Sequence, residues 1–213
     1  GELDTLILVT LKAQAPPILK YLSEDNEMAG GILLSDGAKV DEVFNIATKL
    51  NDWSKKDGNQ IAATQPNTFA GENSAAYTTV FEEKFGEPAN TYSPPAYDCV
   101  TVFAYSLLYA QQSAGGTVDT FTAAHVKEGI RNFKESAQEG ATDAVGIFTD
   151  AFASGAGLIA EGKTIKYSGA SGEILFNEMG DRPSQGMIVF RIAEDGASWN
   201  AAEEWSSSDV TGD

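Results

Sequence analysis

One carboxylate stands where an α/β fold could use it to bind a ligand. Asp36 lies in "LLSDG", at the end of the apolar run "GGILL", which is typical of a buried strand. Doubly wound sheets bind their ligands beyond the carboxyl ends of the strands, and a carboxylate suits a ligand ammonium group. An ordinary Ser-Asp-Gly turn explains the same residues without a ligand. Asp36 is therefore a candidate ligand-binding residue with a plain structural alternative.

Signals for catalysis are weaker. The stretch "GAGLIA" at residues 155–160 matches the G-x-G-x-x-A pattern of dinucleotide-binding turns, but no convincing strand precedes it, so small residues in a helix or loop explain it better. The single histidine, His125, has no serine or cysteine nucleophile nearby in sequence. The acidic stretches "SEDNE" and "NEMGD" lack the ligand spacing of a calcium loop. We therefore expect no enzyme, no cofactor and no metal, and turnover of a bound small molecule would reveal the alternative, an α/β enzyme.

Apolar patterning predicts that strands and helices alternate in the first third of the chain. Apolar runs at residues 4–10 and 30–37 and an extended pattern at 59–66 indicate strands. Between them, a proline pair in "APPILKYLSE" favours a helix start, and "VDEVFNIATKL" has apolar residues at helical spacing. This order predicts right-handed parallel crossovers and an open, doubly wound sheet.

The middle of the chain has a different pattern. From residue 74 to residue 133 three helical patterns follow one another without a convincing strand. The second, "PPAYDCVTVFAYSLLYAQQ", is apolar around most of its circumference, so we expect it to be buried, with Cys99 as a small core residue. Asp119 or Thr120 is the expected N-cap of the third helix, with Ile130 facing inward.

Strand patterns resume near the end. The stretch 163–192, "KTIKYSGASGEILFNEMGDRPSQGMIVFRI", alternates apolar and polar residues, breaks at glycines and restarts as an apolar strand. A turn at Asp195 and Gly196 and another short strand follow. Two separated sets of strands suggest two lobes, although a hairpin within one domain also fits the periodicity.

Composition excludes several classes of function. The 213 residues carry 31 acidic and 14 basic side chains, a formal charge of −17, so the surface should repel nucleic acid and anionic lipid headgroups. No run of 18 apolar residues occurs in the sequence, so no segment is expected to span a membrane. A single cysteine cannot form an internal disulfide and leaves the compartment open.

Three stretches, in order, carry a resemblance to a known family. They are "FEEKFGEPANTYSPPAYDCVTVFAYSL", "LIAEGKTIKYSGASGEILFNEMGD" and the final apolar strand with its "DG" turn. They resemble the type I periplasmic solute-binding proteins of ABC transporters, in particular the branch that binds branched-chain and other amino acids or amides. In that family a helix ending in "KFG" leads through an aromatic loop to a "YD" helix, and "GASG" lies near the hinge. The similarity covers most of the chain, with insertions around residues 51–60 and 134–150.

The resemblance implies an α/β fold with doubly wound parallel sheets in two lobes, present here only in part. Two complete lobes need more than 213 residues, since one domain usually takes about 100 to 150. Residues 1–70 and 187–213 would form the family's second lobe. Residues 71–186 would supply helices and a strand to the other lobe, whose first half is absent from the chain. The stretch 163–192 would then carry the chain from one lobe back towards the other.

The resemblance also implies site residues and a role. Asp36 matches the position of the family's amine-binding acid, although many members carry glutamate there. Tyr92 in "NTYSPP" resembles an aromatic pocket residue, and Thr10 follows the first strand where relatives often have an aromatic or hydroxyl group; packing explains Tyr92 equally well. Both are further candidate ligand-binding residues.

The expected function is that of a periplasmic or extracytoplasmic receptor. It would be a monomer when full length, and it would capture an amino acid, an amide or a similar small polar solute and deliver it to an ABC permease. The alternative is a ligand-sensing domain of the same fold attached to a signalling protein. The polar tail "EEWSSSDVTGD" favours the receptor, because a sensor should continue into a transmembrane or signalling segment.

Overall fold

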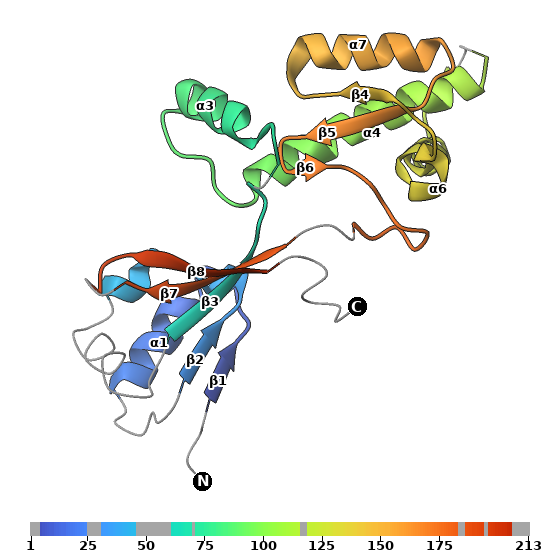
Figure 1. Ribbon diagram of the computed structural model, residues 1–213. Helices are drawn as coiled ribbons and strands as arrows, with labels where there is room; N and C mark the ends of the chain where they lie inside the picture. Colours follow the sequence, from blue (N-terminus) through green and yellow to red (C-terminus); the bar gives the residue numbers. More distant parts are fainter. Residues whose placement is uncertain are drawn as a thin grey trace. The chain divides into compact units, whose positions relative to one another are not determined.

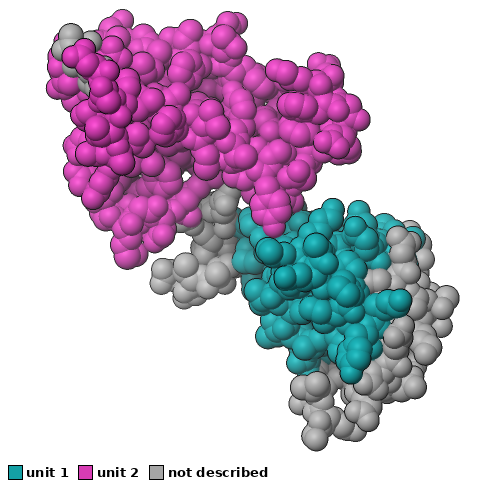
Figure 2. All heavy atoms as spheres, turned by 180° about the vertical axis from the view of Figure 1, so that it is seen from behind, with its two compact units in different colours: residues 1–67, 186–213 teal, residues 68–185 magenta. Residues whose placement is uncertain are grey.

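The chain divides into two compact units. The computed structural model describes residues 5–24, 31–45, 61–69, 71–115, 119–182, 186–193 and 196–205. Unit 1 comprises residues 1–67 and 186–213, and unit 2 comprises residues 68–185 (Figures 1 and 2). The expected lobe boundaries lie near the same positions, and the assignment of each unit to a lobe of the family stays a prediction.

Unit 1 is built on a five-stranded mixed sheet. Its order is β1-β2-β3-β7-β8, with bounds Thr5–Leu8, Gly31–Leu34, Ile61–Pro66, Met187–Ile192 and Trp199–Trp205. The first three strands are parallel, β7 runs antiparallel to β3, and β8 runs antiparallel to β7. The late strand therefore shares a sheet with the three early ones, which confirms the expectation that strands from both ends of the chain belong together.

One face of this sheet holds the core of unit 1. Helix α1, Ala15–Glu24, buries Ala15 and Leu19 against alternate residues of β2 and β3, among them Ile32 and Leu34. Proline is harmless near the start of this helix because the first N–H groups of a helix have no intrahelical partner. The helix expected over residues 40–50 begins instead as a 3-10 turn, Asp41–Asn45, and residues 46–50 lie outside the described ones.

Unit 2 has a smaller sheet and longer helices. Strand β4 (Asp143–Val145) is parallel to β5 (Ile165–Gly169), and β6 (Gly172–Glu173) is antiparallel to β5. The helices are α3 (Ser74–Phe85), α4 (Ser93–Ser113), α5 (Ala123–Ile130), α6 (Glu135–Gln138) and α7 (Phe148–Ala160). Figure 1 shows α4 and α7 running alongside β4 and β5. Within its described part, the stretch 74–133 holds no strand, as its pattern predicts.

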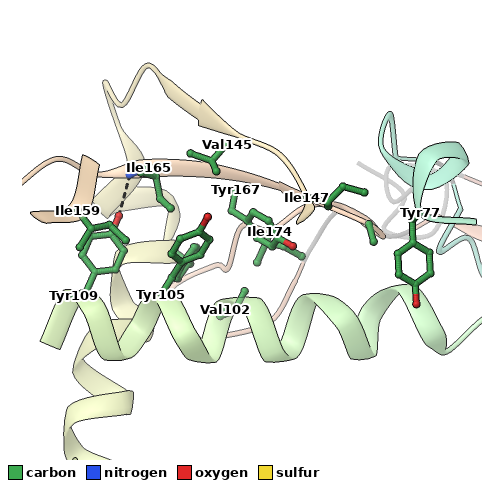
Figure 3. Packing of buried hydrophobic residues seen from close by; sticks show 12 residues of the cluster. Tyr77, Val102, Tyr105, Tyr109, Val145, Ile147, Ile159, Ile165, Tyr167 and Ile174 are labelled. Carbon is green, nitrogen blue, oxygen red and sulfur yellow. Dashed lines mark hydrogen bonds between the residues drawn. The ribbon is translucent and has the colours of Figure 1, made fainter. Parts of the chain in front are cut away.

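The core of unit 2 is rich in tyrosine. Tyr105 and Tyr109 project from α4 towards β5 (Figure 3), where the Tyr109 hydroxyl oxygen accepts the N–H of Ile165 at 2.9 Å. The Tyr105 ring stacks on Phe152 of α7 with centroids 4.8 Å apart. Burial raises the pKa of both tyrosines. A buried tyrosine contributes a large apolar ring and also needs a hydrogen-bond partner for its hydroxyl, which here helps to fix α4 on the sheet.

The expectation that α4 is buried all round is wrong. Its inner face packs on β5 and α7, but Cys99 is exposed, Val100 is 70% exposed and Phe103 is 50% exposed. Periodicity shows that a helix is apolar on two sides, but it does not show whether residues 1–213 cover both of them.

Helix α5 also begins and faces differently from the expectation. It starts at Ala123, so Thr122 is its N-cap in place of Asp119 or Thr120. The Thr122 N–H donates to Nδ1 of His125 at 3.1 Å, a side-chain bond from the first turn that favours this start. Ile130, expected to face inward, is 36% exposed. None of the described helices is long and apolar enough to cross a membrane.

Candidate functional site

The carboxyl edge of the unit 1 sheet brings two of the three candidate residues together. Because β1, β2 and β3 are parallel, the loops after them leave the sheet at the same edge. Thr10 follows β1 and Asp36 follows β2, each two residues after the strand ends. A hydrogen bond of 3.0 Å from the Ser35 N–H to the carbonyl oxygen of Leu8 joins the two loops.

Asp36 opens a tight turn at this edge. It is half-buried and begins the 3-10 turn Asp36–Ala38, and its Oδ1 accepts the N–H of Gly37 at 2.8 Å. A Cβ on Gly37 would lie 2.5 Å from the Thr10 carbonyl oxygen, so the turn sits directly on the backbone of the β1 loop. The Ser-Asp-Gly turn, which was the alternative to a ligand-binding role for Asp36, is thus present. A ligand-binding role for the Asp36 carboxylate stays a prediction.

Thr10 has a local partner. Its hydroxyl donates to Oε1 of Gln14 at 2.7 Å, across the start of α1. Thr10 lies at the same edge as Asp36, where a polar contact to a ligand is expected. This role too stays a prediction.

Tyr92 belongs to unit 2, immediately before α4. Its N–H donates to Oδ1 of Asn90 at 2.9 Å, and the residue is 53% exposed. Thr10 and Asp36 belong to unit 1, so Tyr92 lies in a different unit from both of them.

Lys39, close in sequence to Asp36, makes a cation–π contact that the sequence did not predict. The Nζ atom of Lys39 lies 4.2 Å from the centroid of the Phe190 ring and 5.5 Å from that of Trp199. Burial lowers the pKa of Lys39, and the charge of Asp41 opposes this shift. No local signal reveals this contact, because Phe190 and Trp199 come from the other end of the chain. The cation stabilises the β7–β8 hairpin against the Asp36 turn.

A buried carboxylate joins two of the motifs that carry the resemblance. Asp98, of "YD" in α4, is only 2% exposed. Its Oδ1 accepts the hydroxyl of Tyr167 at 2.9 Å and the N–H of Ala170 at 2.7 Å, and its Oδ2 accepts the N–H of Ser171 at 2.8 Å and the Ser171 hydroxyl. A Cβ on Gly169 would collide with this carboxylate. "GASG" is therefore a short loop wrapped around Asp98, and it needs glycine at its first position for lack of space.

Further contacts fix the same loop. Nη1 of Arg182 donates to the Ser171 hydroxyl oxygen at 2.8 Å, and Nη2 donates to the carbonyl oxygens of Ser171 and Glu173 at 3.0 and 2.7 Å. Burial lowers the pKa of Arg182, against the opposing charge of Asp98. A Cβ on Gly71 would lie 2.5 Å from Cα of Gly172, so the incoming segment of unit 2 packs on the same loop. The loop that Asp98 fixes thus contacts residues of unit 2 that lie close in sequence to both unit boundaries.

The dinucleotide-like pattern lies within a helix. Residues 155–160 lie in the carboxyl-terminal half of α7, so "GAGLIA" is not the strand-to-helix turn that a pyrophosphate needs. Gly155 serves packing, because a Cβ there would lie 2.5 Å from the Tyr105 hydroxyl oxygen. Over the described ranges, no group of three or more His, Cys, Asp or Glu side chains is placed to hold a metal ion.

Comparison with known proteins supports the fold. The structure is similar to a leucine-binding protein from Thermotoga maritima, with a TM-score of 0.58 and 19% sequence identity. The match covers 97% of this chain and 45% of that chain, so residues 1–213 span less than half the length of the solved protein. No family model matches the sequence, and no curated protein matches it either. The chain therefore has a periplasmic binding protein type I-like α/β fold, partial relative to that structure, as the sequence predicts.

Proposed function

We propose that the chain is part of an extracytoplasmic receptor that binds an amino acid or a similar small polar solute and delivers it to an ABC permease. The observation that carries the proposal is the match of almost the whole chain to a leucine-binding protein. The absence of a suitably placed dinucleotide turn in α7 favours a binding protein over a nucleotide-dependent enzyme.

The proposed solute site lies at the carboxyl edge of the unit 1 sheet. Asp36 supplies a carboxylate for a solute ammonium, and Thr10 supplies a hydroxyl from the neighbouring loop at the same edge. Tyr92 is a further proposed ligand contact, because its partly exposed side chain offers an apolar face with a polar end. A receptor of this kind closes its lobes around the solute, because the closed form binds the solute more tightly than the open form does.

The protein produced from its complete gene is tested by calorimetric titration. The titrants are L-leucine, L-isoleucine, L-valine and a panel of other amino acids and amides. Asp36→Asn should weaken binding at least tenfold. Truncating one partner of a desolvated, hydrogen-bonded charge pair costs roughly 2 to 5 kcal/mol. Asp41→Asn is the matched control, because Asp41 is an exposed aspartate on the same connection and should bind as the unchanged protein does.

Two results would speak against this assignment. Equal affinity of the unchanged protein and Asp36→Asn, with both folded, removes Asp36 from the site. No binding of any compound in the panel by the unchanged protein counts against an amino-acid or amide solute.

A further inference from the structure

Unit 2 contains a groove whose lining is mainly aromatic. A cavity of about 570 Å³ lies between α3, the first turns of α4 and the first turn of α7. Binding sites for small molecules are typically cavities of about 300 to 1,000 Å³ lined by apolar and aromatic side chains with few polar groups. We call this cavity the α3–α4 groove, and its aromatic lining consists of Tyr77, Phe81, Phe85, Tyr97 and Phe148.

The five rings form a continuous row. The ring of Phe81 lies between those of Phe85 and Tyr77, with centroids 4.7 and 5.8 Å away. Tyr97 lies 5.5 Å from Tyr77 and 6.2 Å from Phe148. Figure 3 shows Tyr77 reaching from α3 towards α4. Phe85 is 60% exposed, so this end of the row can accept the ring of a ligand in the same stacked or edge-to-face manner.

Phe148 reaches the groove in a strained conformation. Its φ is 72°, in the left-handed region, and it is the only non-glycine residue with positive φ among the described ones. The Tyr97 hydroxyl oxygen accepts its N–H at 2.8 Å, so another residue of the groove holds this backbone in place. Strained residues persist only where their surroundings impose them, and they cluster at sites that bind ligands. The strain therefore points to a ligand independently of the shape of the cavity.

The charge of the groove indicates the kind of ligand. Lys84, exposed in the last turn of α3, is the only charged residue that lines it. None of the ion pairs among the described residues involves Lys84. Its ammonium group can pair with one carboxylate at the end of an aromatic body. The formal charge of −17 disfavours ligands that carry several negative charges.

We propose that the α3–α4 groove is a second ligand-binding site, which takes a small monocarboxylic acid with an aromatic body. The ring of the acid packs on Phe81 and Phe85, and its carboxylate pairs with Lys84. The site lies entirely within unit 2 and goes beyond the proposed solute-binding function, since neither Asp36 nor Thr10 belongs to it.

The probe is hydrocinnamate, and hydrocinnamamide is the control with the same body and no charge. In ligand-observed NMR titrations of the protein produced from its complete gene, both should bind saturably, the acid about three- to fivefold more tightly. Lys84→Gln should remove this preference, whereas Lys127→Gln, at an exposed lysine of α5 outside the groove, should keep it. Ala96→Trp should abolish binding of both compounds, because an indole at this exposed lining position fills the groove. Asp36→Asn should bind both as the unchanged protein does.

Three outcomes overturn the proposal. The first is that hydrocinnamate shows no saturable binding. The second is equal affinity for the acid and the amide in the unchanged protein, which removes the carboxylate from the recognised chemistry. The third is binding that Asp36→Asn abolishes and Ala96→Trp, shown to be folded by circular dichroism, retains, which places the acid at the carboxyl edge of unit 1. Failure of amino-acid binding leaves these titrations unaffected, so the groove and the proposed function are tested separately.

Discussion

Replacement of Asp98 by asparagine should selectively destabilise unit 2. The carboxylate accepts four hydrogen bonds, two on each oxygen. Asparagine keeps the size of the side chain, but its single amide oxygen can replace only one carboxylate oxygen. Its NH2 group would face either the Tyr167 hydroxyl and the Ala170 N–H or the donors of Ser171. Two buried donors therefore lose their acceptor in any orientation of the amide.

The magnitude follows from these contacts. Hydrogen bonds to charged groups contribute about 1.5 to 3 kcal/mol each, so the loss of two predicts a destabilisation of about 3 to 6 kcal/mol. Asp98 is 2% exposed, so solvent does not screen the loss. Tyr167→Phe removes one donor together with its hydroxyl and should cost only about 1 to 2 kcal/mol.

Urea unfolding with two probes can separate the units. All three tryptophans, at positions 53, 199 and 205, belong to unit 1, whereas the three longest described helices, α3, α4 and α7, lie in unit 2. The transition followed by circular dichroism should move to lower urea in Asp98→Asn, and the tryptophan transition should move less. Glu139→Gln, an exposed acidic position of unit 2, is the control and should shift neither transition. A shift of Asp98→Asn no larger than that of Glu139→Gln would refute the reasoning about the loop.

Two further predictions concern packing and pH. Gly155→Ala should lower the stability of unit 2 by about 1 to 3 kcal/mol in urea unfolding, because the added Cβ would meet the Tyr105 hydroxyl. Gly157→Ala has open space around it and should raise the stability of unit 2 by about 0.5 to 1 kcal/mol, so two shifts of the same sign would contradict this packing. Hydrogen bonds from Ser136 and Lys134 lower the pKa of Glu178 below its ordinary 4.5, so its contribution to stability is present above pH 4.5 and is lost as the pH falls through the lowered pKa. The difference in unfolding free energy between the unchanged protein and Glu178→Gln should therefore shrink in acid, and a difference independent of pH would count against this ion pair.

The strands of unit 1 could be predicted because their signal is local. The first two parallel strands are short apolar runs, the third has an extended pattern, and each follows its neighbour in the sheet after one connection. The late strand β7 could be placed beside them only because the resemblance supplied the order of the lobes. Their carboxyl edge, with Thr10 and Asp36, follows directly from the parallel order.

Contacts between residues far apart in the sequence could not be predicted, because no local pattern indicates them. The carboxylate of Asp98 and the loop that wraps it are about 70 residues apart, and the sequence showed only that both motifs exist. Lys39 likewise meets rings from the opposite end of the chain. The prediction for the outer face of α4 was wrong for a different reason. An apolar pattern on a helix does not show which of its sides other residues cover.

The measurement that tests the central claim most directly is mass spectrometry of the small molecules that copurify with the protein produced from its complete gene. The receptor account predicts one bound amino acid, amide or similar polar solute, released unchanged after long incubation and bound again with the same mass. The same solute should be lost during purification of Asp36→Asn and retained by Asp41→Asn. Recovery of a chemically altered molecule would contradict the account, because it would show turnover where we propose reversible binding.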